Sequence, residues 1–393
     1  MKIGYFAGHF PYIDQLNHKN YIKKYAHGGT EIAAYNMAIK MKKRNHDVNI
    51  FTTSMDSNDS IENDHGINIY RYGTNFKIAS ANVALKMIYK PLNYDIDIIH
   101  SHSPTPYSDI PAYIYSRRKN VPFVMSYQFD GIESGGSFIR NSGVTFYNRF
   151  ILNKILEHAD VIISSTRSFL RESKFIKKYE NKSAIIPNGI NLEDFKIDYS
   201  KEVCREKLNL PLNKKIILFL GSLVEYKGPD VLLKAFSMVQ NEYSNVDLIF
   251  AGRGEKEELL RELSIKLNIE NNVHFSGFVD EKLKPLYYKS ADIFCLPSVS
   301  LVESFGIVNL EAMACGVPIV ASRLGGLQDV VEDGKNGLLA EPCDEKSLAK
   351  ALIYLLENED SAKKMGNYGK QRVQDYSWEK IAEKIEKIYE KLL

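Results

Sequence analysis

The sequence predicts an α/β fold of two domains, each built around a parallel sheet. Short runs of β-branched and aromatic residues alternate with helical patterns through most of the 393 residues, as in sheets made of βαβ units. A chain of this length can form two separate cores, and two domains imply a cleft between them. The strand pattern also restarts after the turn signal Asn188-Gly189, which places the domain boundary near this turn.

In the first half, strands are expected at residues 2–7, 48–53, 96–101, 121–127 and 161–165, with 184–187 leading into the turn. The segment His27-Gly28-Gly29-Thr30-Glu31 is expected to open a helix whose apolar face includes Ile32, Tyr35 and Ile39. Long surface loops are expected at 56–64 and 131–143. The second loop is rich in glycine and is expected to form a mobile lid beside the cleft.

In the second half, strands are expected at 215–221, 246–251, 273–276, 293–296, 319–322 and 337–340, with a helix at 229–239. Residues 378–393 carry Ile381, Ile385, Ile388 and Leu392 at helical spacing, which predicts an amphipathic helix that must pack on another element. The expected domains are therefore residues 1–186 and 187–375, followed by a terminal helix at 376–393.

Composition is that of a globular protein, with 44% hydrophobic and 25% charged residues. No apolar run approaches the roughly 18 residues of a membrane span, and the first residues read directly into a strand, so a cytoplasmic protein is expected. Four cysteines lack metal-ligand or redox spacing.

Charge is distributed unevenly along the chain. Residues 1–186 hold 24 Lys and Arg against 16 Asp and Glu, a net charge of +8, whereas residues 187–393 hold 27 against 33, a net charge of −6. The basic half either contacts an anionic acceptor or membrane surface, or carries solvated helix faces.

Glu311 follows Glu303 by eight positions, and Gly316 with Pro318 ends the helix that contains Glu311. At the helical rise the two carboxylates lie roughly 12 Å apart, beyond the about 5 to 9.5 Å of glycoside hydrolases. The amides of residues 305–307 are expected to be free for a phosphate at the helix start. A ligand of sugar, diphosphate and ribose would span the motif; the alternative is an amphipathic helix with a solvated glutamate at each end.

Two glycine-rich loops offer further phosphate contacts. Gly28-Gly29 lets a phosphate approach the helix amides, although a tight turn is an equal explanation. The loop from Gly221 to Gly228 follows a strand and carries Lys227, which can neutralise a diphosphate at the carboxyl ends of the strands. Arg253 follows the next strand and is within reach of the same anion. No phosphate-loop motif of ATPases and kinases occurs.

His100 and His102 alternate at the end of a strand and share one face. A metal site would need further ligands, and Asp95 and Asp97 ahead of the strand resemble solvated residues, so metal-independent chemistry is expected. We assign His100 a structural hydrogen-bonding role and His102 a ligand contact.

The run Glu303-Ser304-Phe305-Gly306-Ile307-Val308-Asn309-Leu310-Glu311-Ala312-Met313-Ala314-Cys315-Gly316-Val317-Pro318 resembles the signature of glycosyltransferase family 4, retaining enzymes of the GT-B fold. Gly28-Gly29-Thr30-Glu31, Ile186-Pro187-Asn188-Gly189, the 221–228 loop and Gly325-Gly326 occur in the family's order. The resemblance implies two Rossmann-like domains that face a central cleft. It places the acceptor site in the first domain and the nucleotide-sugar site in the second, and it implies that the terminal helix crosses back to the first domain.

The resemblance also implies residue roles. Glu303 would bind sugar hydroxyls, Glu311 the ribose and Lys227 the diphosphate. The implied donor site comprises Gly28, Gly29, Ser222, Lys227, Arg253, Glu303, Ser304, Phe305, Gly306, Ile307, Val308 and Glu311. The implied acceptor site comprises His102, Tyr127, Gln128 and Asp130, and catalysis is assigned to Lys227, Glu303 and Gln128, without a metal or other cofactor.

This chain departs from the family pattern at two positions. Ser222 stands where members usually carry arginine, which removes a cation from the diphosphate site. Gln128 stands where relatives often have histidine, and glutamine can donate a hydrogen bond but cannot act as a general base. These departures either redirect or reduce activity.

The leading hypothesis is metal-independent, retaining transfer of a hexosyl group from a nucleotide diphosphate sugar to a hydroxyl of a saccharide or glycolipid. A UDP-sugar is favoured, with GDP-mannose as the alternative. A competing hypothesis is a nucleotide-sugar-binding protein of the same fold that has lost catalysis. A dehydrogenase is disfavoured because no Gly-x-Gly-x-x-Gly follows the first strand.

Overall fold

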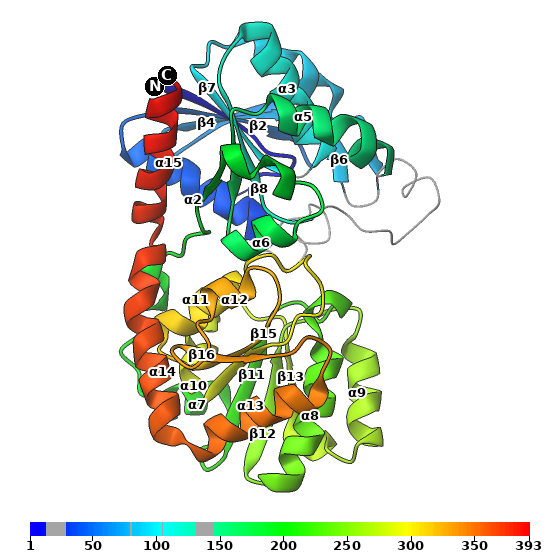
Figure 1. Cartoon of the computed structure of the whole chain (residues 1–393), viewed down its shortest axis with the longest axis vertical. Coiled ribbons are helices and arrows are strands. Elements are labelled where there is room, and N and C mark those ends of the chain that lie inside the picture. The colour runs from blue at the N-terminus through cyan, green and yellow to red at the C-terminus, as the bar shows by residue number, and fades with distance from the viewer. Residues whose placement is uncertain (13–28, 79–80, 104, 131–144) are drawn as a thin grey trace. The chain divides into compact units, whose positions relative to one another are not determined.

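The computed structural model describes residues 1–12, 29–78, 81–103, 105–130 and 145–393 (Figure 1). Contacts divide the chain into two units, one formed by Met1–Asn188 with Trp378–Leu393 and the other by Gly189–Ser377. The first unit thus contains two separate pieces of the chain, whereas the second is continuous. The boundaries lie within two residues of those expected from the sequence.

The sheet of the first unit has the order β10-β9-β8-β7-β1-β2-β4-β3. Its strands are β1 (Lys2–Phe6), β2 (Asp47–Thr53), β3 (Ser60–Asp64), β4 (Ile67–Tyr72), β7 (Ile98–Ser103), β8 (Phe123–Tyr127), β9 (Val161–Ser164) and β10 (Ser183–Ile185). All neighbours are parallel except β3 and β4. A separate antiparallel pair joins β5 (Phe76–Ile78) to β6 (Ala81–Val83).

The expected surface loop at 56–64 is partly wrong, because its second half forms the edge strand β3. This strand reads Ser-Ile-Glu-Asn-Asp, and its single apolar side chain, Ile61, is 72% exposed. An edge strand without a buried face has no alternation for the sequence to show. The expected lid at 131–143 lies outside the described residues.

The helices of the first unit are α2 (Gly29–Lys43), α3 (Pro106–Lys119), α5 (Leu152–His158, preceded by the π-helical turn Tyr147–Ile151), α6 (Arg167–Glu172) and α15 (Trp378–Leu392). The expected apolar face of α2 is incomplete, because its most buried residues are Ala33, Ala34, Met37, Ala38 and Met41. The bulkier Tyr35 and Ile39 are only half-buried. The buried face therefore combines small alanines with two methionines, and Tyr35 and Ile39 pack at its edge.

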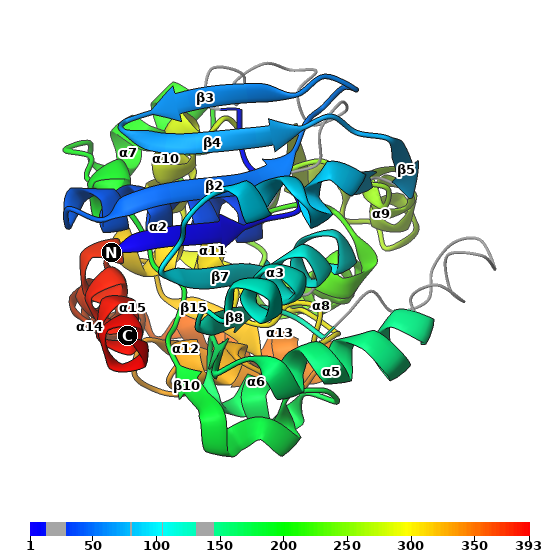
Figure 2. The same ribbon diagram turned by 90° about the horizontal axis from the view of Figure 1, so that it is seen from above.

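The terminal helix α15 packs on α2 in the first unit (Figure 2), as the resemblance implies for an amphipathic helix at this position. Ile381, Ala382 and Ile385 are buried in the same core as the first strand. At its far end, Tyr389 Oη lies 2.5 Å from His100 Nδ1 and 3.1 Å from Tyr5 Oη. His100 Nε2 lies 2.7 Å from Ser126 Oγ, so His100 has the structural role predicted for it.

The second unit contains one parallel sheet of order β13-β12-β11-β14-β15-β16. Its strands are β11 (Lys215–Leu220), β12 (Val246–Ala251), β13 (Val273–Gly277), β14 (Ile293–Leu296), β15 (Ile319–Ser322) and β16 (Gly337–Ala340). Its helices are α7 (Lys201–Leu208), α8 (Pro229–Glu242), α9 (Glu257–Lys266), α10 (Lys284–Ser290), α11 (Ile307–Ala314), α12 (Leu327–Val330), α13 (Glu345–Glu357) and α14 (Glu359–Arg372). The strand order reverses between β11 and β14, and ligands bind at the carboxyl ends of strands at such a switch point.

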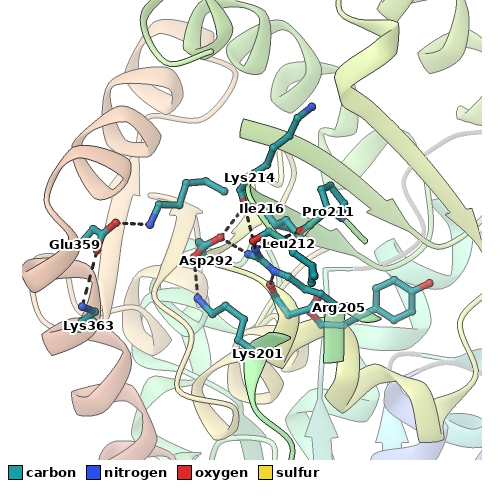
Figure 3. A network of polar contacts seen from close by, with 12 residues as sticks. Lys201, Arg205, Pro211, Leu212, Lys214, Ile216, Asp292, Glu359 and Lys363 are labelled. Carbon is teal, nitrogen blue, oxygen red and sulfur yellow. Dashed lines mark hydrogen bonds and ion pairs between the residues drawn. The ribbon is translucent and has the colours of Figure 1, made fainter. Parts of the chain in front are cut away.

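A buried charge network ties the amino ends of β11 and β14 to α7 (Figure 3). The Asp292 carboxylate accepts hydrogen bonds from the Ile216 amide at 2.8 Å and from Arg205 Nη2 at 2.7 Å. Lys201 Nζ lies 2.8 Å from the same carboxylate. Burial opposes ionisation of Asp292, but these cations and the amide hold its pKa below the usual value. Arg205 is buried and also donates to carbonyls, including that of Ser290.

Replacing Asp292 with alanine should destabilise the protein by about 3 to 5 kcal/mol, because it leaves the Arg205 guanidinium buried without its counter-ion. Urea denaturation at pH 7 measures this effect. The control Glu359→Ala removes the exposed partner of Lys215 and should change stability by less than about 1 kcal/mol.

The depressed pKa of Asp292 also gives a pH dependence. The advantage of the wild type over Asp292→Asn should be complete above the unfolded-state pKa of about 4 and should shrink as the pH falls toward the folded-state pKa. Equal stability of the two proteins at pH 7 would refute the role assigned to this charge.

Candidate functional site

The loop after β11 holds Lys227 close to the end of that strand. Lys227 lies in a short 3-10 turn, Glu225–Lys227, which ends at Gly228 with φ 64°. A Cβ at Gly221 would lie 3.4 Å from Lys227 Nζ, so the side chain folds back over the strand end. Burial opposes protonation of Lys227, but the charge and hydrogen bond of Glu303, with contributions from Tyr226 and Glu311, together raise the pKa of Lys227. The lysine is therefore a cation at neutral pH.

Glu303, in the loop after β14, joins this cation to the start of α11. Its Oε2 lies 2.9 Å from Lys227 Nζ, with the two side chains 14% and 12% exposed. Its Oε1 accepts a hydrogen bond from the Gly306 amide at 3.1 Å. The prediction that the Gly306 amide is free is therefore wrong, because the Glu303 carboxylate already accepts from it. The amides of Ile307 and Val308 occupy the first two helical positions, where no intrahelical acceptor exists.

Only glycine fits at position 306. Its φ is 71°, and a Cβ there would lie 2.6 Å from Leu327 Cδ2 and 2.8 Å from Asn309 Nδ2. Leu327 follows β15, so the loops after two neighbouring strands meet at this glycine. The close packing fixes the direction in which the Ile307 and Val308 amides point.

Glu311 lies one turn into α11 and is held by two groups from α10. Tyr288 Oη donates to Glu311 Oε2 at 2.6 Å, and Lys284 Nζ lies 3.5 Å from Oε1. Lys284 also pairs with Glu281 at 2.8 Å. The charge of Glu311 contributes to the raised pKa of Lys227, so both glutamates of the motif act on one cation. Tyr288 and Lys284 were not predicted, because no spacing rule connects them to a residue more than 20 positions away.

The remaining predicted donor-site residues differ in their surroundings and are divided between the two units. Ser222 is exposed, directly after Gly221, and the Leu223 amide donates to the Arg253 carbonyl at 3.0 Å, so the loops after β11 and β12 touch. The Arg253 side chain runs past Gly277, where a Cβ would lie 3.4 Å from its Nε. In the described part of the chain Arg253 makes no ion pair. Phe305 is buried and Ser304 nearly so. Gly29 begins α2 in the first unit, whereas Gly28 lies outside the described residues.

The predicted acceptor residues lie on or after β7 and β8 in the first unit. His102 is buried, and burial lowers its pKa to about 4, so the ring is neutral at pH 7. Neither of its ring nitrogens has a hydrogen-bond partner among the described residues. His102 borders a cavity of about 20 Å³, which is enough for one water-sized group. Other residues that line this cavity include His9, Thr30, Glu31 and Tyr107.

The other three acceptor candidates differ in their surroundings. Tyr127 is buried with its ring stacked on Phe169, and Gln128 is half-buried just beyond the strand. Asp130 accepts hydrogen bonds from the Ser173 hydroxyl and, at 2.7 Å, from the Lys174 amide. Burial raises the pKa of Asp130. Both oxygens of this carboxylate therefore already hold the chain after α6.

Within the described residues there is no cluster of three or more His, Cys, Asp and Glu side chains suited to a metal ion. None of the helices described above combines the length and apolar character needed to cross a bilayer.

Two family models match the chain. The model "Glycosyltransferase Family 4" matches residues 27–194, and the model "Glycosyl transferases group 1" matches residues 200–372. The chain is 34% identical over 254 residues to a D-inositol 3-phosphate glycosyltransferase of Corynebacterium urealyticum. That match covers 62% of this chain but only 59% of the relative's length. An uncharacterised glycosyltransferase of Methanocaldococcus jannaschii is 29% identical over 376 residues, which cover 92% of this chain and 94% of the relative.

The fold is shared with solved structures. The Anabaena protein HepE in complex with UDP superposes with a TM-score of 0.76 at 21% identity and covers 100% of both chains. At this identity the likeness establishes the architecture alone.

The anchoring of Glu311 gives a prediction. Tyr288→Phe should destabilise the protein by about 1.5 to 3 kcal/mol, because it removes a buried hydrogen bond to a charged group. Chemical denaturation measures the change. The control Tyr354→Phe removes an exposed hydroxyl and should change stability by less than about 0.5 kcal/mol. Equal effects of the two substitutions would show that Tyr288 does not hold Glu311.

Proposed function

The chain belongs to glycosyltransferase family 4 and has the GT-B fold, and we propose that it moves a hexosyl group from a nucleotide diphosphate sugar to an acceptor hydroxyl. The observation that carries the proposal is the convergence of Lys227, Glu303 and the α11 amino end at the strand-order switch between β11 and β14. A cation and backbone amides in one buried place suit a diphosphate leaving group.

The proposed mechanism stabilises the departing diphosphate. In this scheme Lys227 and the amides of Ile307 and Val308 would stabilise the negative charge that develops as the bond from sugar to phosphate breaks. Glu303 would accept hydrogen bonds from the sugar and Glu311 from the ribose. Since Gln128 cannot remove a proton, we assign that task to the leaving phosphate, with attack on the same face of the sugar and retention of configuration. No metal is required in this scheme.

For the donor, we favour a UDP-sugar, with GDP-mannose as the alternative. The shared architecture with a protein solved with UDP supports this choice. Arg253 lies beside Gly277, and Phe278 is 54% exposed, so this segment offers a surface for the base. For the acceptor, we propose a saccharide or glycolipid hydroxyl in the first unit, near His102 and its cavity. The charge of +8 in residues 1–186 favours an anionic acceptor or peripheral contact with an anionic membrane.

A second candidate is a nucleotide-sugar-binding protein without transferase activity. Ser222 and Gln128 motivate it, because the family resemblance implies that members usually carry arginine at the first position and often histidine at the second. Binding of a nucleotide sugar without transfer, and without slow hydrolysis, across a broad acceptor panel would favour this candidate.

Nucleotide binding can be measured by thermal stability in EDTA with UDP, GDP and their sugars. A ligand at about 100 times its dissociation constant should add roughly 2.7 kcal/mol, which raises the melting temperature by a few degrees. Stabilisation by one base series in EDTA would identify the donor class and show that nucleotide binding needs no metal. No stabilisation by any nucleotide would contradict both candidates.

Lys227→Ala should lower kcat by about 10²- to 10³-fold, as expected for removal of one group that stabilises a leaving oxyanion. The matched control is Lys234→Ala in α8, where the lysine pairs with Glu345 at a partly exposed site. Turnover with the identified donor is the measurement. A Lys227→Ala rate close to that of Lys234→Ala would contradict the mechanism.

A further inference from the structure

We propose that the Glu303 carboxylate occupies the position of a donor phosphate group when no ligand is bound. Because a ligand must displace this carboxylate, the site binds a nucleotide sugar more tightly than the free nucleotide diphosphate. The inference rests on the proposed function, because it concerns the same site. The proposal gives Glu303 a role in specificity: this residue weakens binding of the free nucleotide diphosphate and also contacts the sugar.

The geometry shows one carboxylate on two anion-binding groups. Glu303 Oε2 lies 2.9 Å from Lys227 Nζ, and Oε1 accepts from the Gly306 amide at 3.1 Å. The cation and the helix amino end are also the groups that would receive phosphate oxygens. A diphosphate therefore cannot use Lys227 fully while Glu303 keeps both contacts.

Displacement has an energetic consequence. The Glu303 side chain is 14% exposed, so a carboxylate that leaves Lys227 has little access to water. A buried charge without partners is strongly unfavourable. A free nucleotide diphosphate offers only further negative charge to Glu303. A sugar on the same diphosphate offers hydroxyl donors. These can replace the hydrogen bonds that Glu303 loses and offset the free-energy cost of its displacement.

Glu311 provides an internal contrast. It also acts electrostatically on Lys227, but Tyr288 Oη holds it at 2.6 Å and Lys284 lies 3.5 Å away. Its hydrogen bonds come from α10 and not from the groups that would receive the diphosphate. Glu311 can therefore remain in place when a ligand binds, whereas Glu303 must exchange its partners. After transfer, the sugar is gone and Glu303 can return to Lys227, which favours release of the nucleotide product.

The test is calorimetric titration of wild type and Glu303→Gln with UDP, GDP, UDP-glucose and GDP-mannose. Glutamine can still accept from the Gly306 amide but forms no ion pair with Lys227. Glu303→Gln should therefore bind the free nucleotide diphosphate at least about five-fold more tightly than the wild type. Its preference for the sugar-linked form over the free form should fall by about ten-fold or more. Glu303→Asp keeps the charge but is too short for both contacts, and should shift binding in the same direction by less.

Two controls separate release of the site from loss of charge. Glu311→Gln removes a carboxylate from the same neighbourhood without freeing Lys227 or the Gly306 amide, and should not tighten binding of the free nucleotide. Glu345→Gln removes one negative charge from the same unit, at the pair with Lys234, and should have no effect. Inorganic pyrophosphate serves as a probe that does not depend on the base, and should also bind Glu303→Gln more tightly.

The outcomes are distinguishable. If the wild type binds none of the nucleotides, the proposed function fails. If it binds them but both Glu303 variants bind the free diphosphate equally well or more weakly, this inference fails and the proposed function stands. An equal gain in affinity of Glu311→Gln for the free nucleotide would also overturn the inference, because the loss of one negative charge would then explain the effect. If Glu303→Gln does not fold, Glu303→Asp decides the question by the same comparison.

Discussion

The candidate site depends on the parallel pairing of β11 with β12 on one side and β14 on the other. Parallel strands end at one edge of a sheet, so loops distant in the sequence become neighbours there. Lys227 follows β11, Arg253 follows β12 and Glu303 follows β14. Gly252 lets the loops after β11 and β12 touch, because a Cβ there would lie 1.9 Å from the Gly221 carbonyl oxygen. A Cβ at Gly306 would instead collide with the Leu327 side chain. The Asp292 network secures the opposite ends of β11 and β14, so the two strands keep their register.

Much of this architecture could be predicted from the sequence, because buried parallel strands are continuous apolar runs. The ranges of β12, β14, β15 and β16 agree with expectation to the residue. The predicted secondary structure was wrong for a strand that buries little apolar surface, and the predicted apolar face was incomplete for a helix that buries small side chains. The exposed strand β3 has a single apolar residue, and α2 buries its alanines, Met37 and Met41 more deeply than Tyr35 and Ile39.

The site was predictable only in part, for a related reason. A motif names residues and an approximate spacing, so Lys227, Glu303 and Glu311 could be singled out from the sequence. It does not show which polar groups are satisfied within the fold. Glu303 accepts a hydrogen bond from the Gly306 amide, and Tyr288 donates one to Glu311. Both bonds depend on side-chain directions that arise from packing between elements. The carboxylate of Asp130, which already anchors the chain after α6, illustrates the same limit.

The position of α15 has a consequence for biosynthesis. The core of the first unit includes Ile381, Ile385 and Tyr389, which leave the ribosome only after all of residues 189–377. The second unit is contiguous and can fold while translation continues, since domains fold as units during synthesis. Until α15 is synthesised, the first unit cannot complete its core. The buried face of α2 then lacks its contact with α15, and Tyr5 and His100 lack their hydrogen bonds to Tyr389. The order of maturation is therefore the reverse of the order of synthesis, and a nascent chain stalled before residue 378 would expose a surface for chaperones.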